Sequence, residues 1–86
     1  TFVDIRARLA AAHRDQGQRA RAIAEYEEIV RQSPGFLPAR LNLGLCLYAD
    51  GRKGEAARQW EEVLRLAPGN RSAEMYLKLA AAGPKG

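Results

Sequence analysis

A pattern of residues in the first half of this chain returns 34 residues later. Residues 26–31 read Tyr-Glu-Glu-Ile-Val-Arg and precede Pro34-Gly35, whereas residues 60–65 read Trp-Glu-Glu-Val-Leu-Arg and precede Pro68-Gly69. Aligning residues 3–36 with 37–70 gives identical residues at Arg6/Arg40, Leu9/Leu43, Gly17/Gly51, Ala22/Ala56, Glu27/Glu61, Glu28/Glu62, Arg31/Arg65, Pro34/Pro68 and Gly35/Gly69. A fixed period of this length predicts a solenoid of stacked helix pairs, because one pair alone cannot bury its apolar side.

Five stretches of the chain carry apolar residues at helical spacing. They span about 3–16, 19–32, 38–49, 53–66 and 72–82, and glycine or proline lies between each and the next. Ser72 is placed to cap the last one. Because the connections are short, neighbouring helices are expected to pack antiparallel. We predict an all-α fold, an α-solenoid of five helices. It forms a single domain over 1–86, with repeats at 3–36 and 37–70, a capping helix at 71–82 and a tail at 83–86.

The second unit resembles the tetratricopeptide repeat. The residues that carry the resemblance are Leu43-Gly44, Leu47-Tyr48, Gly51, Glu55-Ala56, Trp60 and Pro68. The first unit matches less completely, through Leu9, Ala10, Gly17, Ala22, Tyr26 and Pro34. It carries His13 where a large apolar side chain is usual, and residues 71–82 resemble the first helix of a third repeat. The resemblance covers nearly the whole chain.

The shared residues also have a packing interpretation. Ala10 and Gly44 are small enough for paired helices to approach closely, and Ala22 and Ala56 do the same from the partner helix. The large side chains of Tyr26 and Trp60 are expected to fill the gap between successive pairs. Larger residues at the small positions would overpack these contacts.

The fifth helix is expected to end the array. Lys78 stands where the earlier repeats have Ala10 or Gly44, and a lysine does not fit a close helix contact. Glu74 precedes Lys78 by four residues, in the order that favours an exposed ion pair. The residues expected to be buried are Ala73, Leu77 and Ala80. Such a helix is a polar cap, which terminal repeats need for solubility.

The N-terminal side has no polar cap of this kind, because Phe2, Val3 and Ile5 are apolar. Earlier repeats or another domain are therefore expected to precede this segment in a longer chain.

The family resemblance implies binding on the concave face, which the first helix of each pair lines. The expected groove residues are Ala7, Arg8, Ala11, Arg14, Leu41, Asn42, Leu45, Tyr48, Met75, Tyr76 and Leu79. Most of this surface is apolar and aromatic, and its entrance is basic, which suits an amphipathic helix or extended peptide with an apolar anchor and an acidic flank. The alternative is that Leu41, Leu45 and Leu79 simply pack against one another.

One finer family property is not expected. Chaperone-binding members hold a C-terminal carboxylate with lysine, arginine and asparagine side chains from three first helices. Only Asn42 matches that set, and the other four positions hold Ala7, Ala11, Ser72 and Tyr76. Without cations there is little to hold a carboxylate at these positions.

No set of residues points to catalysis or a metal site. His13 has no histidine or cysteine companion and is interpreted as a partly buried residue between helices. Cys46 lies among leucines and is interpreted as a core residue. Adjacent helix positions point about 100° apart, so the Glu27-Glu28 pair and its repeat do not converge on one substrate. We predict no enzyme, no cofactor and no metal.

The net charge of +4 is spread along the chain, and glutamates interrupt it. Nucleic-acid binders gather their cations into one stripe, so no nucleic acid is expected, and two repeats would read only about two bases. No apolar run approaches the roughly 20 residues of a membrane span, so no membrane insertion of this segment is expected. The single cysteine leaves the localisation open and slightly favours the cytoplasm.

The predicted function is non-catalytic protein–protein interaction, as an adaptor or scaffold that binds a peptide or amphipathic helix in its groove. The alternative is self-association, in which the open N-terminal face or the groove pairs between chains.

Overall fold

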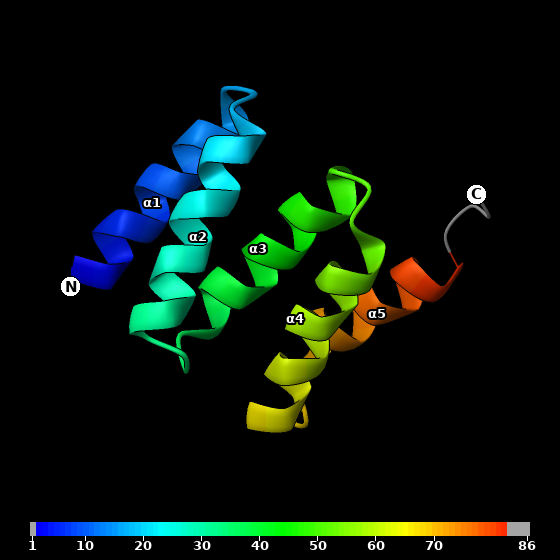
Figure 1. Cartoon of the computed structure of the whole chain (residues 1–86). Coiled ribbons are helices and arrows are strands. Elements are labelled where there is room, and N and C mark those ends of the chain that lie inside the picture. The colour runs from blue at the N-terminus through cyan, green and yellow to red at the C-terminus, as the bar shows by residue number, and fades with distance from the viewer. Residues whose placement is uncertain (1, 83–86) are drawn as a thin grey trace.

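The computed structural model describes residues 2–82, and it folds into five helices with no strand in that range (Figure 1). The helices are α1 (Phe2–Asp15), α2 (Arg19–Gln32), α3 (Leu37–Ala49), α4 (Lys53–Leu66) and α5 (Arg71–Ala82). Each helix packs on its neighbours in the chain, and α3 also contacts α1 and α5. The molecule measures 36 × 29 × 17 Å. The prediction of an all-α solenoid is confirmed. Residues 83–86, the predicted tail, lie outside the described range.

Two glycines form the turns inside the repeats. Gly17 follows α1 with φ 81°, and Gly51 follows α3 with φ 82°, a left-handed conformation that side chains with a Cβ rarely adopt. The backbone N–H of Gln18 donates to the carbonyl of His13, and that of Arg52 donates to Leu47, both at 2.8 Å. These bonds close the last turns of α1 and α3 in the same way. The two repeats therefore turn identically.

The start of α5 differs from the sequence prediction. Ser72 is not the N-cap. The Oδ1 of Asn70 accepts a hydrogen bond of 2.9 Å from the backbone N–H of Ala73, and the helix begins at Arg71. An asparagine in that place satisfies one of the free N–H groups of the first turn. Both residue types cap helices well, so composition alone did not decide between them.

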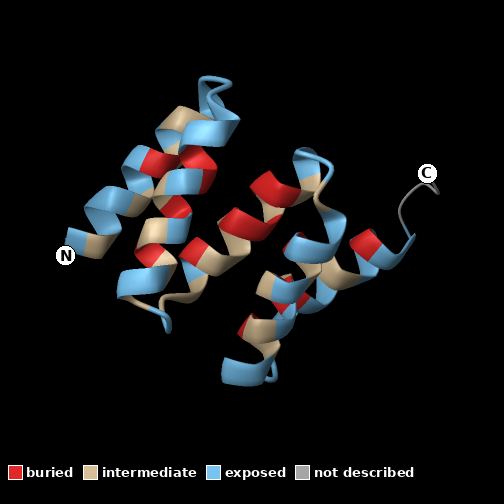
Figure 2. Ribbon diagram, viewed as in Figure 1, coloured by how far each residue is buried: buried red, intermediate tan, exposed pale blue. Residues whose placement is uncertain are grey.

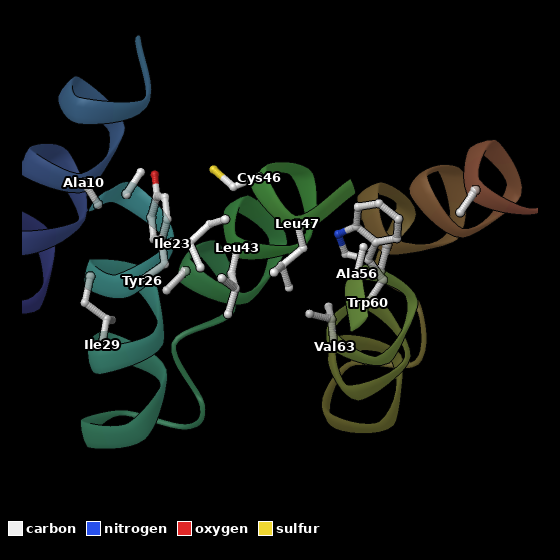
Figure 3. Packing of buried hydrophobic residues seen from close by; sticks show 14 residues of the cluster. Ala10, Ile23, Tyr26, Ile29, Leu43, Cys46, Leu47, Ala56, Trp60 and Val63 are labelled. Atoms are coloured by element: carbon white, nitrogen blue, oxygen red, sulfur yellow. The ribbon is translucent and has the colours of Figure 1, made fainter. Parts of the chain in front are cut away.

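The core runs as a stripe through all five helices (Figure 2). Tyr26 and Trp60, the large residues predicted to fill the gaps between helix pairs, are completely buried. Ala22 and Ala56, one helical turn before them, are buried as well. Cys46 is a core residue with 2% of its surface exposed, as predicted. Figure 3 shows Tyr26 and Cys46 pointing into the same space between α2 and α3.

Gly44 allows the closest helix approach. A Cβ atom built on Gly44 would lie 2.2 Å from Nε1 and 2.5 Å from Cε2 of Trp60. The indole therefore rests directly on the backbone of α3, and its Nε1 donates a hydrogen bond of 3.2 Å to the Leu41 carbonyl. The prediction that this position must be small is confirmed.

The fifth helix covers the core of the second repeat. Ala73 and Ala80 are buried and Leu77 is half-buried, whereas Glu74 and Lys78 are exposed. Within residues 2–82, however, Glu74 and Lys78 do not form the predicted ion pair. An exposed pair of this kind gains little in water and costs side-chain entropy, so the two side chains remain separate.

Tyr26 provides a test of the core. Its hydroxyl is buried and has no hydrogen-bond partner among the residues that the structure describes, and burial raises the pKa of this phenol. Because an unpartnered buried hydroxyl costs about 1–3 kcal/mol, Tyr26→Phe is expected to leave the free energy of unfolding unchanged or to raise it. Urea unfolding followed by circular dichroism measures this.

The pH dependence supplies the control for that experiment. The raised pKa means that the folded state favours the neutral phenol. The titration of Tyr26 therefore leaves the free energy of unfolding unchanged below about pH 10 and lowers it as pH rises above that value. The advantage of Tyr26→Phe should therefore grow above about pH 10. A loss of stability at neutral pH would show that the hydroxyl is satisfied after all.

Candidate partner-binding groove

The predicted groove residues, together with Tyr26 and Trp60, form two sets that the repeat relates to each other. Positions 14, 26 and 42 in the first half correspond to 48, 60 and 76 in the second, at the spacing of 34 residues. The first set is Arg14, Tyr26 and Asn42, and the second is Tyr48, Trp60 and Tyr76. The same geometry therefore carries a polar set in one half and an aromatic set in the other.

A hollow of about 310 Å³ marks the polar half. Its walls come from α1, α2 and the start of α3: Asp4, Ala7, Arg8, Ala11, Arg14, Tyr26, Phe36, Pro38 and Asn42. The hollow brings together the predicted groove residues of the first repeat with Asn42. Asp4, Phe36 and Pro38 were not among the predicted groove residues. The signal for Pro38 was available, because it lies one helical turn before the predicted groove residues Leu41 and Asn42.

Arg14 and Asn42 join the two first helices across this hollow. Arg14 Nη1 donates a hydrogen bond of 2.8 Å to Asn42 Oδ1, and Asn42 Nδ2 donates one of 2.9 Å to the Pro38 carbonyl. Asn42 is thus held in one orientation. Arg14 also contacts Asp15 at 3.2 Å, and its side chain is 35% exposed, so its guanidinium keeps donors for another group.

The aromatic half is centred on Trp60. Its ring centroid lies 6.2 Å from that of Tyr48 and 5.3 Å from that of Tyr76, with tilted planes. Trp60 is buried, whereas Tyr48 and Tyr76 are half-buried. The two tyrosines therefore present part of their surface to solvent beside a buried indole ring. Aromatic rings at these distances attract one another when they are tilted and not stacked face to face, so the three rings stabilise this cluster.

The apolar residues around this centre divide into two kinds. Leu41 and Leu45 are half-buried against the core, so much of their surface is used in helix packing. Met75 and Leu79 on α5 are 58% and 51% exposed. The alternative interpretation, in which Leu41, Leu45 and Leu79 pack against one another, would leave about half of the Leu79 surface open. Met75 and Leu79 leave apolar surface open at the end of the array.

His13 and Cys46, which were considered as catalytic residues, both contact neighbouring parts of the fold. His13 lies between α1 and α2, 18% exposed, with Nδ1 at 2.6 Å from Glu25 Oε1. Burial raises the pKa of the Cys46 thiol, which keeps it protonated. Within residues 2–82 no three histidine, cysteine or acidic side chains lie close enough to hold a metal ion.

The repeated glutamate pairs are part of their own helices. Glu28 pairs with Arg31 and Glu62 with Arg65, each within one turn. The hydrogen bond from Arg65 also holds the pKa of the Glu62 carboxyl below its ordinary value. Neither carboxylate is directed at a shared substrate position.

A comparison with protein families finds one matching model, described as tetratricopeptide repeat, over residues 7–71. The match begins in the middle of α1, covers most of the first repeat and all of the second, and ends at the first residue of α5. No curated protein matches the chain. In the described residues, none of the helices has the length and apolar character needed to cross a membrane.

Proposed function

The chain belongs to the tetratricopeptide repeat family, and from that premise we propose that its groove binds a peptide or helix of a partner protein that carries an acidic group beside an apolar anchor. Repeats of this family generally mediate protein–protein interaction and are typically non-catalytic, often as adaptors or scaffolds. The observation that supports this particular partner is the division of the groove into a polar and an aromatic half.

The polar half suits an acidic group. Arg8 and Arg14 both line the hollow, and Arg8 is exposed. Arg14 is already oriented by Asn42, so it loses little side-chain entropy when it donates to a carboxylate. Asp4 also lines the hollow, and its charge disfavours an acidic group at that end. We place the acidic group of the partner over Arg8 and Arg14.

The aromatic half suits an apolar anchor. Its contact area is formed by the exposed parts of Tyr48, Tyr76, Met75 and Leu79. Tyrosine, tryptophan and arginine supply much of the binding energy at protein interfaces, and this groove offers two of these types. A partner of one or two helical turns, or a short extended peptide, would span both halves.

The test is a selection of random peptides on the immobilised protein, followed by affinity measurements on the selected peptides. The selected peptides are expected to share an acidic residue and a large apolar residue. Arg14→Gln, which retains a donor for Asn42, should weaken them about tenfold, because a hydrogen bond to a charged group contributes roughly 1.5 kcal/mol. Binding should also weaken as salt is added.

Charge-matched and apolar controls separate the groove from the rest of the surface. Arg8→Glu should reduce the affinity, whereas Arg6→Glu on the other side of α1 should not. Met75→Ser with Leu79→Ser should reduce it too, in contrast to Leu66→Ser, a similarly exposed leucine on α4. Selected peptides that tolerate both groove variants would contradict the proposal.

Self-association is the second candidate, and the exposed apolar residues at the two ends of the array favour it. The large ones are Phe2, Ile5 and Leu9 on α1 and Met75 and Leu79 on α5. Light scattering over a range of concentrations tests it directly. A constant monomer mass would exclude this candidate.

A further inference from the structure

The outer face of α1 carries a stripe of apolar residues that no other helix of residues 2–82 covers, although the Arg6 guanidinium lies 5.5 Å from the centroid of the Phe2 ring. The stripe consists of Phe2, Ile5, Leu9 and Ala12, and all four are exposed. The first three are exposed by 74%, 63% and 55% of their surfaces. Their spacing places them on one side of the helix. These residues differ from the groove residues of the same helix, which are Ala7, Arg8, Ala11 and Arg14.

The repeat shows what such a stripe does elsewhere in the molecule. The equivalent residues of the second repeat are Phe36, Ala39, Leu43 and Cys46, at the start of and along α3. Leu43 is 1% exposed and Ala39 is completely buried, because α2 packs on this side of α3. Figure 3 shows Ile23 and Tyr26 pointing from α2 toward Leu43 and Cys46.

The equivalent stripe on α5 is also buried by the helix that precedes it. On α5 the equivalent residues are Asn70, Ala73, Leu77 and Ala80, and α4 packs against this helix. Ala73 is completely buried and Ala80 is 6% exposed. Two of the three first helices therefore bury this stripe against a preceding second helix. On α1 the stripe is the most apolar of the three and is the one left exposed.

We infer that the outer face of α1 is a docking site for an amphipathic helix of the α2 and α4 type, the second helix of another tetratricopeptide repeat. This face is the equivalent of an interface that the molecule already contains twice, between α2 and α3 and between α4 and α5. The occupant lies antiparallel to α1 and covers Phe2, Ile5 and Leu9 with branched and aromatic side chains, as Ile23 and Tyr26 cover α3. The inference concerns a surface outside the groove and does not depend on the proposed function.

The repeat supplies the occupant for the experiment. Thr1 corresponds to Gly35, so a copy of residues 17–35 in place of Thr1 reproduces the connection between α2 and α3 ahead of Phe2. The extended chain is expected to melt about 5 °C or more above the original one. A second extension, with serine at the positions copied from Ile23 and Ile29, should not give this increase.

Leu9→Ser shows whether the added helix lies on the stripe. In the original chain Leu9 is exposed, and the substitution should change the melting temperature little. In the extended chain it should remove most of the increase. Leu79→Ser is the matched control, since Leu79 is 51% exposed on α5 and should act equally in both chains. An unchanged melting temperature of the extended chain, or an equal effect of Leu9→Ser in both, overturns the inference.

A fluorescent peptide of residues 17–35 added to the full chain gives an independent readout if the extended chain does not fold. Its anisotropy should rise with the original chain and not with Leu9→Ser. If the original chain forms dimers and the Leu9→Ser variant does not, the face binds a second copy of the chain, and the inference is overturned. The inference is also overturned if the peptide does not bind and the extension does not raise the melting temperature.

Discussion

Trp60→Ala should lower the free energy of unfolding by about 3–5 kcal/mol, the range seen when a large buried aromatic residue is truncated. Trp60 is completely buried and is the largest side chain in the core. Typical domains are stable by about 5–15 kcal/mol, and a chain this short lies toward the lower end. The variant should therefore be largely unfolded near 37 °C, which thermal unfolding followed by far-UV circular dichroism measures.

The size of the effect follows from the number of elements that Trp60 joins. Its ring rests on Gly44 of α3, its Nε1 donates to the Leu41 carbonyl, and its ring lies beside those of Tyr48 and Tyr76. Truncation thus loosens the contact of α4 with both α3 and α5. The cavity cannot easily collapse, because the backbone of α3 at Gly44 forms one of its walls.

Trp60→Phe separates volume from hydrogen bonding in the same experiment. It keeps most of the apolar contact and loses the indole N–H, so its cost should be well below that of the alanine variant. Leu66→Ala on the same helix is the surface control, since Leu66 is 42% exposed. A cost of Trp60→Ala below about 1 kcal/mol would contradict the packing described for the second repeat.

The fold could be predicted because the same local sequence signals occur in both repeats. The glycines at 17 and 51, the prolines at 34 and 68 and the alternation of small and large residues all act over short distances. The start of α5 could not be predicted in this way. Asn70 and Ser72 both suit an N-cap, and the backbone path after Pro68-Gly69 selects Asn70.

The polar half of the groove was harder to predict, because it depends on an approach between α1 and α3. Arg14 and Asn42 are 28 residues apart, and each was predicted separately as a groove residue. Their hydrogen bond requires the first helices of successive repeats to lie side by side. The equivalence of 14 and 42 with 48 and 76 was present in the alignment. The alignment identifies equivalent positions, but it does not predict which side chains form hydrogen bonds with each other.

Gly44→Ala should destabilise the protein, although glycine to alanine inside a helix ordinarily stabilises it by roughly 0.5–1 kcal/mol. The new Cβ would lie 2.2 Å from Trp60 Nε1, and real Cβ atoms do not approach a heavy atom so closely. The indole cannot easily move away, because Tyr48 and Tyr76 lie beside it and the ring is completely buried. Overpacking of this kind costs about 1–3 kcal/mol, which exceeds the gain in helix propensity.

The first repeat indicates how this loss can be reversed. There Ala10 occupies the position of Gly44 and Tyr26 that of Trp60, and both are completely buried. Alanine is thus compatible with a single six-membered ring at this contact. Gly44→Ala combined with Trp60→Tyr should therefore be more stable than the sum of the two single effects predicts, by about 1 kcal/mol or more. A double-mutant cycle in urea measures this coupling. Additive effects would show that the indole moves freely, and that the small residue at position 44 is not fixed by Trp60.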